Sequence, residues 1–125
     1  MRESMASRVK SIASLLACAS LFLGTGLLGA PPAHAAPTWI TCVPVQSMTF
    51  AVRVHVRCAT SVGGIRFFAL GTSDAPAAAR VLSVITSALV SGRPLDVLYD
   101  PNDLSGASIG CQTNDCRLIQ AIGVK

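Results

Sequence analysis

The segment FAVRVHVRC, residues 50–58, carries the clearest structural signal in this chain. Apolar or cysteine side chains occupy every second position, and Arg53, His55 and Arg57 lie between them. This period of two, built on β-branched valines, predicts a half-buried β-strand. Its apolar face is expected to hold Phe50, Val52, Val54, Val56 and Cys58.

Further strands, separated by turns, are predicted on both sides of this segment. The Gly63–Gly64 pair predicts a turn, and Pro44 is expected to restrict the chain just after an earlier strand. Between the last two predicted strands, DPNDLSG is dense in turn-forming residues. The four further strands predicted are residues 39–43, 65–70, 95–99 and 117–124.

A single helix is predicted between residues 73 and 92. Ser73 or Asp74 can cap its start, Pro76 fits its first turn, and Gly92 suits a left-handed end. Apolar residues recur within it at steps of three and four, which predicts one buried stripe. The stripe consists of Val81, Leu82, Ile85 and Leu89.

The expected order is therefore strand, strand, strand, helix, strand, strand. A small antiparallel sheet cannot bury both faces by itself, so the helix must cover one open side or end. A five-stranded OB-like partial barrel closes most sheet edges and suits a chain of this size. We therefore expect a mainly β fold with one α-helix, stapled by disulfides.

The first 35 residues have the pattern of a secretory signal peptide. Three basic residues precede an apolar run over residues 12–28, and Ala33-His34-Ala35 offers a small-x-small cleavage site. This reading is preferred to a membrane anchor, because glycines interrupt the run and no basic stop follows it. Cleavage would leave residues 36–125 as a single domain that is secreted or periplasmic.

Four cysteines follow the signal segment, namely Cys42, Cys58, Cys111 and Cys116. An even number of cysteines in a small exported chain predicts disulfides. A zinc site is not expected, because there is no C-x-x-C knuckle and His55 is the only histidine beyond residue 35. No cofactor is predicted.

The sequence carries no catalytic motif that survives its context. GASIG at residues 106–110 matches G-x-S-x-G, but a cysteine loop and a strand follow Ser108, and no histidine lies after it. Residues 36–125 hold seven basic residues against five acidic ones and few aromatics, which argues against nucleic-acid binding. We expect neither an enzyme nor, after signal removal, a membrane span.

Two groups of residues are candidates for binding. Arg53, His55 and Arg57 form either a cationic patch for a carboxylate or phosphate or, in the preferred reading, a solvated polar sheet face. One helix face is small and nearly uncharged, which fits either a neighbouring subunit or simply an Ala/Ser-rich helix. That face consists of Arg80, Ser83, Ser87 and Ser91. Trp39 is expected in the core rather than against a sugar ring.

Three features together resemble the B subunits of subtilase-cytotoxin-like and pertussis-like bacterial toxins. Cys42 and Cys58 bracket paired strands, the helix leads into VSGRPLDVLYD, and CQTNDC places four small polar residues between two cysteines. The resemblance implies an OB-like fold, disulfides Cys42–Cys58 and Cys111–Cys116, and a ring of five subunits with helices lining its pore. It also implies glycan binding, often of sialylated sugars, and an enzymatic A-type partner subunit.

One feature departs from that family. In those toxins a longer segment before the first cysteine supplies an extra strand and a serine that contacts the sugar, whereas here only residues 36–41 lie between the cleavage site and Cys42. No glycan-contacting residue is therefore carried over. The leading hypothesis is a secreted, non-enzymatic and oligomeric binding subunit. The alternative is a stand-alone secreted or periplasmic domain that binds or inhibits another protein without sugar recognition.

Overall fold

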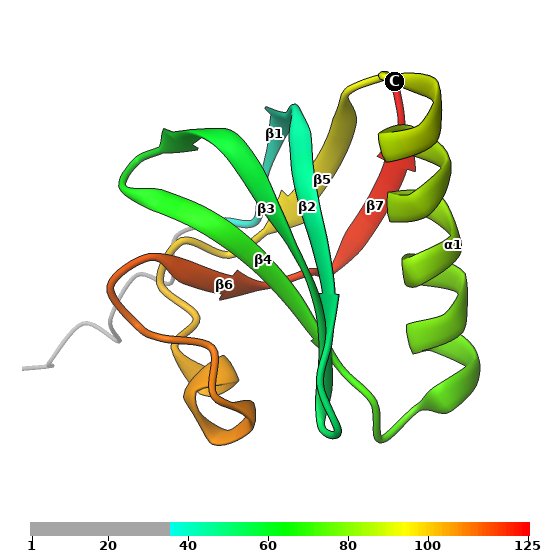
Figure 1. Ribbon diagram of the computed structural model, residues 1–125. Coiled ribbons are helices and arrows are strands. Elements are labelled where there is room, and N and C mark those ends of the chain that lie inside the picture. The colour runs from blue at the N-terminus through cyan, green and yellow to red at the C-terminus, as the bar shows by residue number, and fades with distance from the viewer. Residues whose placement is uncertain (1–35) are drawn as a thin grey trace, which may run out of the picture. The chain divides into compact units, whose positions relative to one another are not determined.

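The computed structural model describes residues 36–125, which form seven β-strands, one α-helix and a short 3-10 helix (Figure 1). The predicted signal segment and its cleavage site lie outside the described residues. In chain order, the elements are β1 (Thr38–Cys42), β2 (Pro44–Thr49), β3 (Arg53–Val62), β4 (Ile65–Gly71), α1 (Ala75–Ser91), β5 (Leu95–Tyr99), η1 (Ser105–Ile109), β6 (Cys116–Leu118) and β7 (Ala121–Val124).

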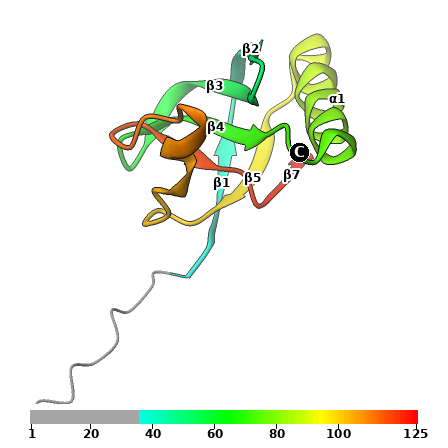
Figure 2. The same cartoon turned by 90° about the horizontal axis from the view of Figure 1, so that it is seen from below.

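The strands form two sheets. Three antiparallel strands form the first sheet, in the order β1-β5-β7, and four form the second, in the order β2-β3-β4-β6. In the second sheet β2, β3 and β4 are consecutive and antiparallel, whereas β6 runs parallel to β4. Figures 1 and 2 show α1 on one side of these sheets and the loop carrying η1 on the other.

The prediction of a mainly β fold with one helix is confirmed, but the predicted number of five strands is wrong. The structure has seven strands in two sheets that do not form a closed barrel. The segment expected as one strand at 117–124 is divided between β6 and β7. Ile119 N donates to Ala69 O of β4 and Gln120 N to Leu98 O of β5, so the chain crosses here from one sheet to the other.

A similar crossing divides the start of the fold. β1 ends at Cys42 in the first sheet and β2 begins at Pro44 in the second, with Val43 between them. Pro44 has no backbone N–H to give to a strand ladder, so a proline is tolerated at a first strand position. The sequence did not predict β2.

The central strand begins later than its sequence pattern suggests. β3 starts at Arg53, and Phe50 N donates to Arg53 O at 2.7 Å across a tight turn. Phe50 and Val52 therefore do not belong to the buried face, and both are exposed. Val54, Val56 and Cys58 lie in the core, as the alternation predicts.

The predicted helix is confirmed together with its caps. Asp74 Oδ1 accepts a hydrogen bond from Ala77 N at 2.9 Å, which satisfies a free N–H of the first turn. Gly92 ends the helix with φ 67°, a conformation that glycine adopts without steric cost. Of the predicted apolar stripe, Ile85 is fully buried, and Val81 and Leu89 pack against the core.

The main core lies between α1 and the two sheets. Its largest fully buried side chains are Phe68, Ile85, Leu95, Val56 and Val97. Cys42 and Cys58 form a disulfide within this cluster, and Cys111 and Cys116 form a second one, so the predicted disulfides are confirmed. The expectation that Trp39 fills the core is wrong, because 57% of its surface is exposed. Among residues 36–125, no helix is long and apolar enough to cross a membrane.

Candidate functional site

The second face of the β2-β3-β4-β6 sheet is covered by the long loop between β5 and β6. This loop includes η1, which contacts β4 and β6. Beneath it, Ala69, Cys111 and Cys116 form a small buried cluster, against which Phe67 and Ile109 pack. A face that the sequence presents as polar is therefore partly enclosed.

His55 lies at the centre of this enclosed face. Only 7% of the residue is exposed, and its ring lies 5.1 Å from the Phe50 ring and 5.5 Å from the Phe67 ring, measured between centroids. The preferred reading of Arg53, His55 and Arg57 as a solvated sheet face is therefore wrong for His55. The loop and the two phenylalanine rings shield it from water.

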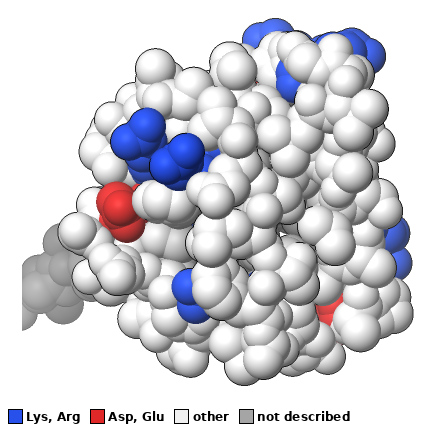
Figure 3. All heavy atoms as spheres, viewed as in Figure 1, with Lys and Arg blue, Asp and Glu red and all other residues white. Residues whose placement is uncertain are grey.

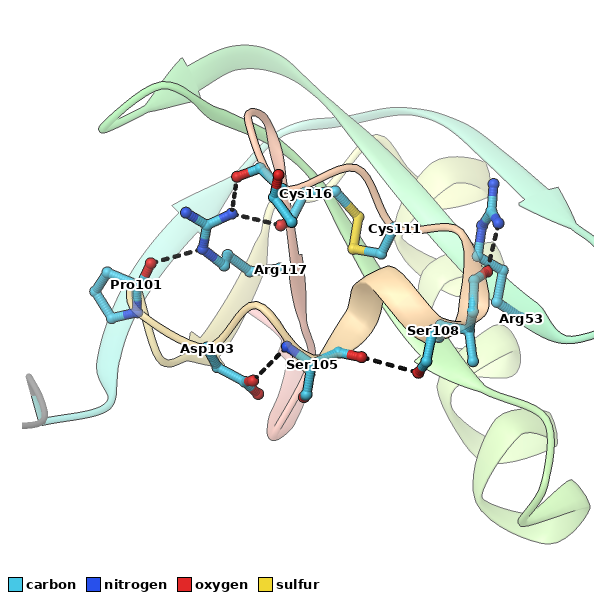
Figure 4. The surroundings of a disulfide bond; sticks show 10 residues. Arg53, Pro101, Asp103, Ser105, Ser108, Cys111, Cys116 and Arg117 are labelled. Carbon is cyan, nitrogen blue, oxygen red and sulfur yellow. Dashed lines mark hydrogen bonds between the residues drawn. A yellow bond between two sulfur atoms is a disulfide. The ribbon is translucent and has the colours of Figure 1, made fainter.

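Arg53 is held beside His55 by two interactions. Its Nη1 donates to Ile109 O at 2.6 Å, and its Cζ lies 4.1 Å from the centroid of the Phe50 ring, a cation–π geometry. Figure 4 shows the guanidinium directed toward the loop. Arg53 therefore links the start of β3 to the end of η1.

An open cavity of about 320 Å³ adjoins these side chains. Its walls come from β3, from β4 and from the loop before β6, and they consist of Arg53, His55, Phe67, Gly110, Gln112, Asp115 and Cys116. The cavity combines cationic, carboxylate, amide and aromatic groups, which is typical of a site that orients a polar ligand. Arg57 shares the strand face with Arg53 and His55 but does not line the cavity.

Three buried nitrogen atoms on this strand face have no hydrogen-bond partner among residues 36–125. They are Arg53 Nε, His55 Nε2 and Arg57 Nε. A buried polar group without a partner costs about 1–3 kcal/mol, so such groups are uncommon in folded proteins. Two of the three atoms, Arg53 Nε and His55 Nε2, belong to side chains that line the cavity.

Electrostatics keep His55 neutral near pH 7. Burial lowers its pKa from 6.5, and the nearby positive charge of Arg53 lowers it further. Asp115 contributes a carboxylate to the cavity wall, and its backbone oxygen accepts hydrogen bonds from Arg66 N and Phe67 N. Near neutral pH the cavity thus presents one guanidinium, one neutral imidazole and one carboxylate.

Arg117 and the Cys111–Cys116 disulfide stabilise the loop that forms the outer wall. Arg117 Nε donates to Pro101 O at 2.6 Å, and Nη1 donates to Thr113 O and Cys116 O at 2.7 Å each (Figure 4). The hydrogen bonds that Ser105 donates to the Asp103 carboxyl lower the pKa of this carboxyl. One of them, from Ser105 N to Asp103 Oδ1, holds the first residue of η1 in place. The wall is therefore cross-linked at several points.

Sequence reasoning missed the aromatic and loop residues of the cavity. Phe67 belongs to IRFFAL, which was predicted only as a strand, and Gln112 and Asp115 lie within CQTNDC. The polar loop between two cysteines could have marked Gln112 and Asp115 as candidates. The sequence around this loop does not show, however, which strand the loop covers. Ser108, from the G-x-S-x-G match, lies in η1 outside the cavity and donates to Ser105 O at 2.9 Å. No cluster of residues within 36–125 has the composition to hold a metal ion.

The candidate helix face lies apart from this cavity. Arg80, Ser83, Ser87 and Ser91 are all exposed on α1. Ser91 Oγ donates to Ser87 O at 2.7 Å, and neighbouring Val90 is 84% exposed. The surface over the helix in Figure 3 is mainly uncharged.

Comparisons of the chain with protein-family models, with curated proteins and with solved structures find no match.

Proposed function

We propose that this protein is a secreted binding protein and that the cavity beside His55 is its ligand site. The observation that carries the proposal is the pair of buried, unpartnered nitrogens, His55 Nε2 and Arg53 Nε, on side chains that line an open cavity. A ligand that accepts hydrogen bonds would satisfy these groups. The expected gain is about 1–3 kcal/mol for each group so satisfied.

We further propose that the fold is a distorted OB-like barrel. The supporting observation is the pairing of strands: β5 pairs with both β1 and β7, β1 continues past Val43 into β2, and β6 continues past Gln120 into β7. If each divided pair is taken as one bent strand, the pairings form a ring of five. OB-folds bind oligonucleotides and oligosaccharides on the second and third strands and the adjacent loops. In this chain β3, β4 and the loop before β6 line the cavity.

The ligand class that we propose is a glycan. Gln112 and Asp115 can accept hydrogen bonds from sugar hydroxyls, Arg53 can donate to them, and the Phe67 ring offers an apolar surface. Residues 36–125 hold few aromatics and a nearly balanced charge, which does not favour a nucleic acid. Two disulfides support export to an oxidising compartment.

The helix face supports a proposed oligomer. Arg80 is the only charged residue between Pro76 and Ser91, and the exposed residues there are short enough for a second helix to approach closely. We propose self-association through this face into a ring of five, with an enzymatic subunit as a further partner, by analogy with the toxin B subunits. This assembly is separate from the ligand cavity.

A second candidate function has its own supporting observation. Trp39 on β1, Val43 between the two strands and Val45 on β2 are 57%, 53% and 44% exposed. Exposed apolar side chains close together in the sequence suit a protein partner. This observation favours the stand-alone protein-binding or inhibitory domain.

A glycan array probed with the full chain tests the proposed function. Arg53→Gln should weaken binding by at least about tenfold, corresponding to the loss of one charge-assisted hydrogen bond. Arg93→Gln is the matched control, because it removes the same charge from an exposed position outside the cavity. Glycan binding that Trp39→Ser abolishes and Arg53→Gln leaves intact would contradict the cavity as the sugar site. An array without any binder would contradict the glycan and favour the protein-binding alternative.

A further inference from the structure

His55 is a titratable group whose side chain lines the proposed ligand site and carries a buried nitrogen without a partner among the described residues. This nitrogen is Nε2. A neutral imidazole bears a proton on one ring nitrogen only, whereas an imidazolium donates from both. Protonation therefore turns the pair of His55 and Arg53 into two cationic donors at one cavity.

The surroundings of His55 define what such a pair can hold. The rings of Phe50 and Phe67 flank the imidazole, and its strand neighbours in the sheet register are Met48 on β2 and Ala69 on β4. None of these four can neutralise a positive charge. The groups that contribute charge on this face are Arg53 and Arg57, from the same strand, and Asp115, from the loop.

An imidazolium here is destabilised by its surroundings, because burial and Arg53 both oppose it. An anion in the cavity reverses the balance, since it offers the opposite charge to both side chains. Asp115 lines the same cavity but does not supply that compensation, because the pKa of His55 is lowered from 6.5 in its presence. The missing negative charge must come from the ligand.

We infer that the cavity recognises an anionic group of its ligand, a carboxylate or a sulfate ester, and that His55 takes up a proton as this group binds. The inference deepens the proposed function and rests on the cavity being the ligand site. Arg53 supplies the permanent charge, and His55 adds a second charge whose presence depends on pH. The ligand is therefore held more tightly as the pH falls.

Sulfate is a suitable first probe, because its charge stays constant between pH 5 and 8 and any pH dependence must come from the protein. Calorimetry on the full chain should show sulfate affinity rising by up to about tenfold per pH unit as the pH falls through the titration of His55. Titrations in buffers of different ionisation enthalpy should approach one proton taken up per sulfate bound. His55→Gln should remove both effects, and Arg93→Gln should preserve them.

A second readout follows His55 directly. The chain contains two histidines, His34 and His55, so a His34→Gln background leaves one imidazole signal in the NMR spectrum. Saturating sulfate should shift its titration midpoint to higher pH. This shift does not depend on comparing the stabilities of variants.

The source of the anionic group is resolved by three sugars: glucuronic acid, galactose 6-sulfate and neutral galactose. Preference for the first identifies a carboxylate, and preference for the second a sulfate ester. Sulfate affinity that stays constant from pH 5 to 8, failure of sulfate to bind at any pH, or a wild-type pH slope in His55→Gln would each overturn the inference. Glycan binding that is independent of pH would do so while leaving the proposed function in place.

Discussion

The guanidinium of Arg53 occupies the space that a β-carbon on Gly110 would fill. Gly110 has φ 81°, and the nearest atom to a β-carbon at this position is Arg53 Nη1. The same Nη1 donates to Ile109 O. The missing side chain of Gly110 therefore lets the arginine reach the loop and form one wall of the cavity.

Gly110→Ala should displace Arg53 and weaken ligand or sulfate binding by about tenfold or more, the value of one charge-assisted hydrogen bond. It should also lower the unfolding free energy by about 1–3 kcal/mol through backbone strain and lost contacts. Calorimetry and urea unfolding measure the two effects.

Gly64→Ala is the matched control for this substitution. Gly64 has a similar φ of 84°, but a β-carbon at this position would have no atom within 4 Å. It should show the strain cost alone, with ligand affinity unchanged. Equal affinity losses in the two variants would contradict the role given to Arg53.

The buried state of His55 predicts a pH-dependent stability. Its pKa in the folded protein is below the unfolded value of 6.5, because burial and Arg53 disfavour the charged form. As the pH falls through 6.5 the unfolded chain gains this proton first, so the unfolding free energy decreases until the pH passes below the folded pKa. Urea unfolding from pH 8 to 4.5 should show this decrease in wild type.

His55→Gln should lose this component of the pH profile. The difference between the wild-type and variant curves isolates it from the carboxylates that also titrate in acid. The difference should be flat above pH 7.5 and change as the pH falls. A difference curve that is flat over the whole range would show that His55 titrates alike in both states.

The two disulfides should differ in whether their removal mainly lowers the stability of the protein or its affinity for the ligand. Closing the loop of Cys42–Cys58 is expected to contribute about 3 kcal/mol and that of Cys111–Cys116 about 2 kcal/mol, because the first spans 16 residues and the second 5. Replacing Cys42 and Cys58 by alanine should therefore cost more stability, in urea unfolding, than replacing the other pair.

Ligand affinity should show the opposite order. Cys116 lines the cavity and Cys111 is its disulfide partner, whereas Cys42 and Cys58 belong to the main core. The Cys111→Ala, Cys116→Ala protein should bind about tenfold more weakly than wild type because its loop is less preorganised. Unchanged affinity in this variant would mean that Arg117 and the η1 hydrogen bonds hold the wall without the disulfide.

The helix face predicts an oligomer that a single charge can disrupt. Light scattering on the wild-type protein should report an assembly at micromolar concentration, and Ser87→Glu should shift it toward the monomer by placing a charge within the interface. Thr60→Glu, at an exposed position of β3 outside this helix face, should leave the assembly unchanged. A wild-type protein that is monomeric at this concentration would contradict the proposed ring of five subunits.

Local patterning predicted those elements whose signals lie in consecutive residues. The alternation through Val54, Val56 and Cys58 and the capped stripe around Ile85 needed no distant partner. The divisions at Val43 and at Ile119–Gln120 were not predicted, because each arises where the chain leaves one sheet for the other. Which strands pair there depends on residues that are distant in the sequence, because Ile40 pairs with Val97 and Ile119 N donates to Ala69 O.

The cavity shows the same limit. Arg53 and His55 were identified as candidates from their position on the polar side of β3, but a period of two cannot distinguish a face covered by water from one covered by a loop. The residues that cover it, among them Phe67 and Asp115, come from other segments. Their turn-rich sequence has no periodicity that could assign them to a sheet face.

The separation between sheet partners also predicts the order in which the protein folds. Strands β2, β3 and β4 pair with their immediate neighbours in sequence, whereas β1 must find β5, and β4 must find β6, across long intervening segments. Pairings between nearby segments close smaller loops and form faster. Because Gln112 and Asp115 precede β6, we expect the cavity to be completed among the last steps of folding, so that binding of the proposed ligand would report a fully folded chain.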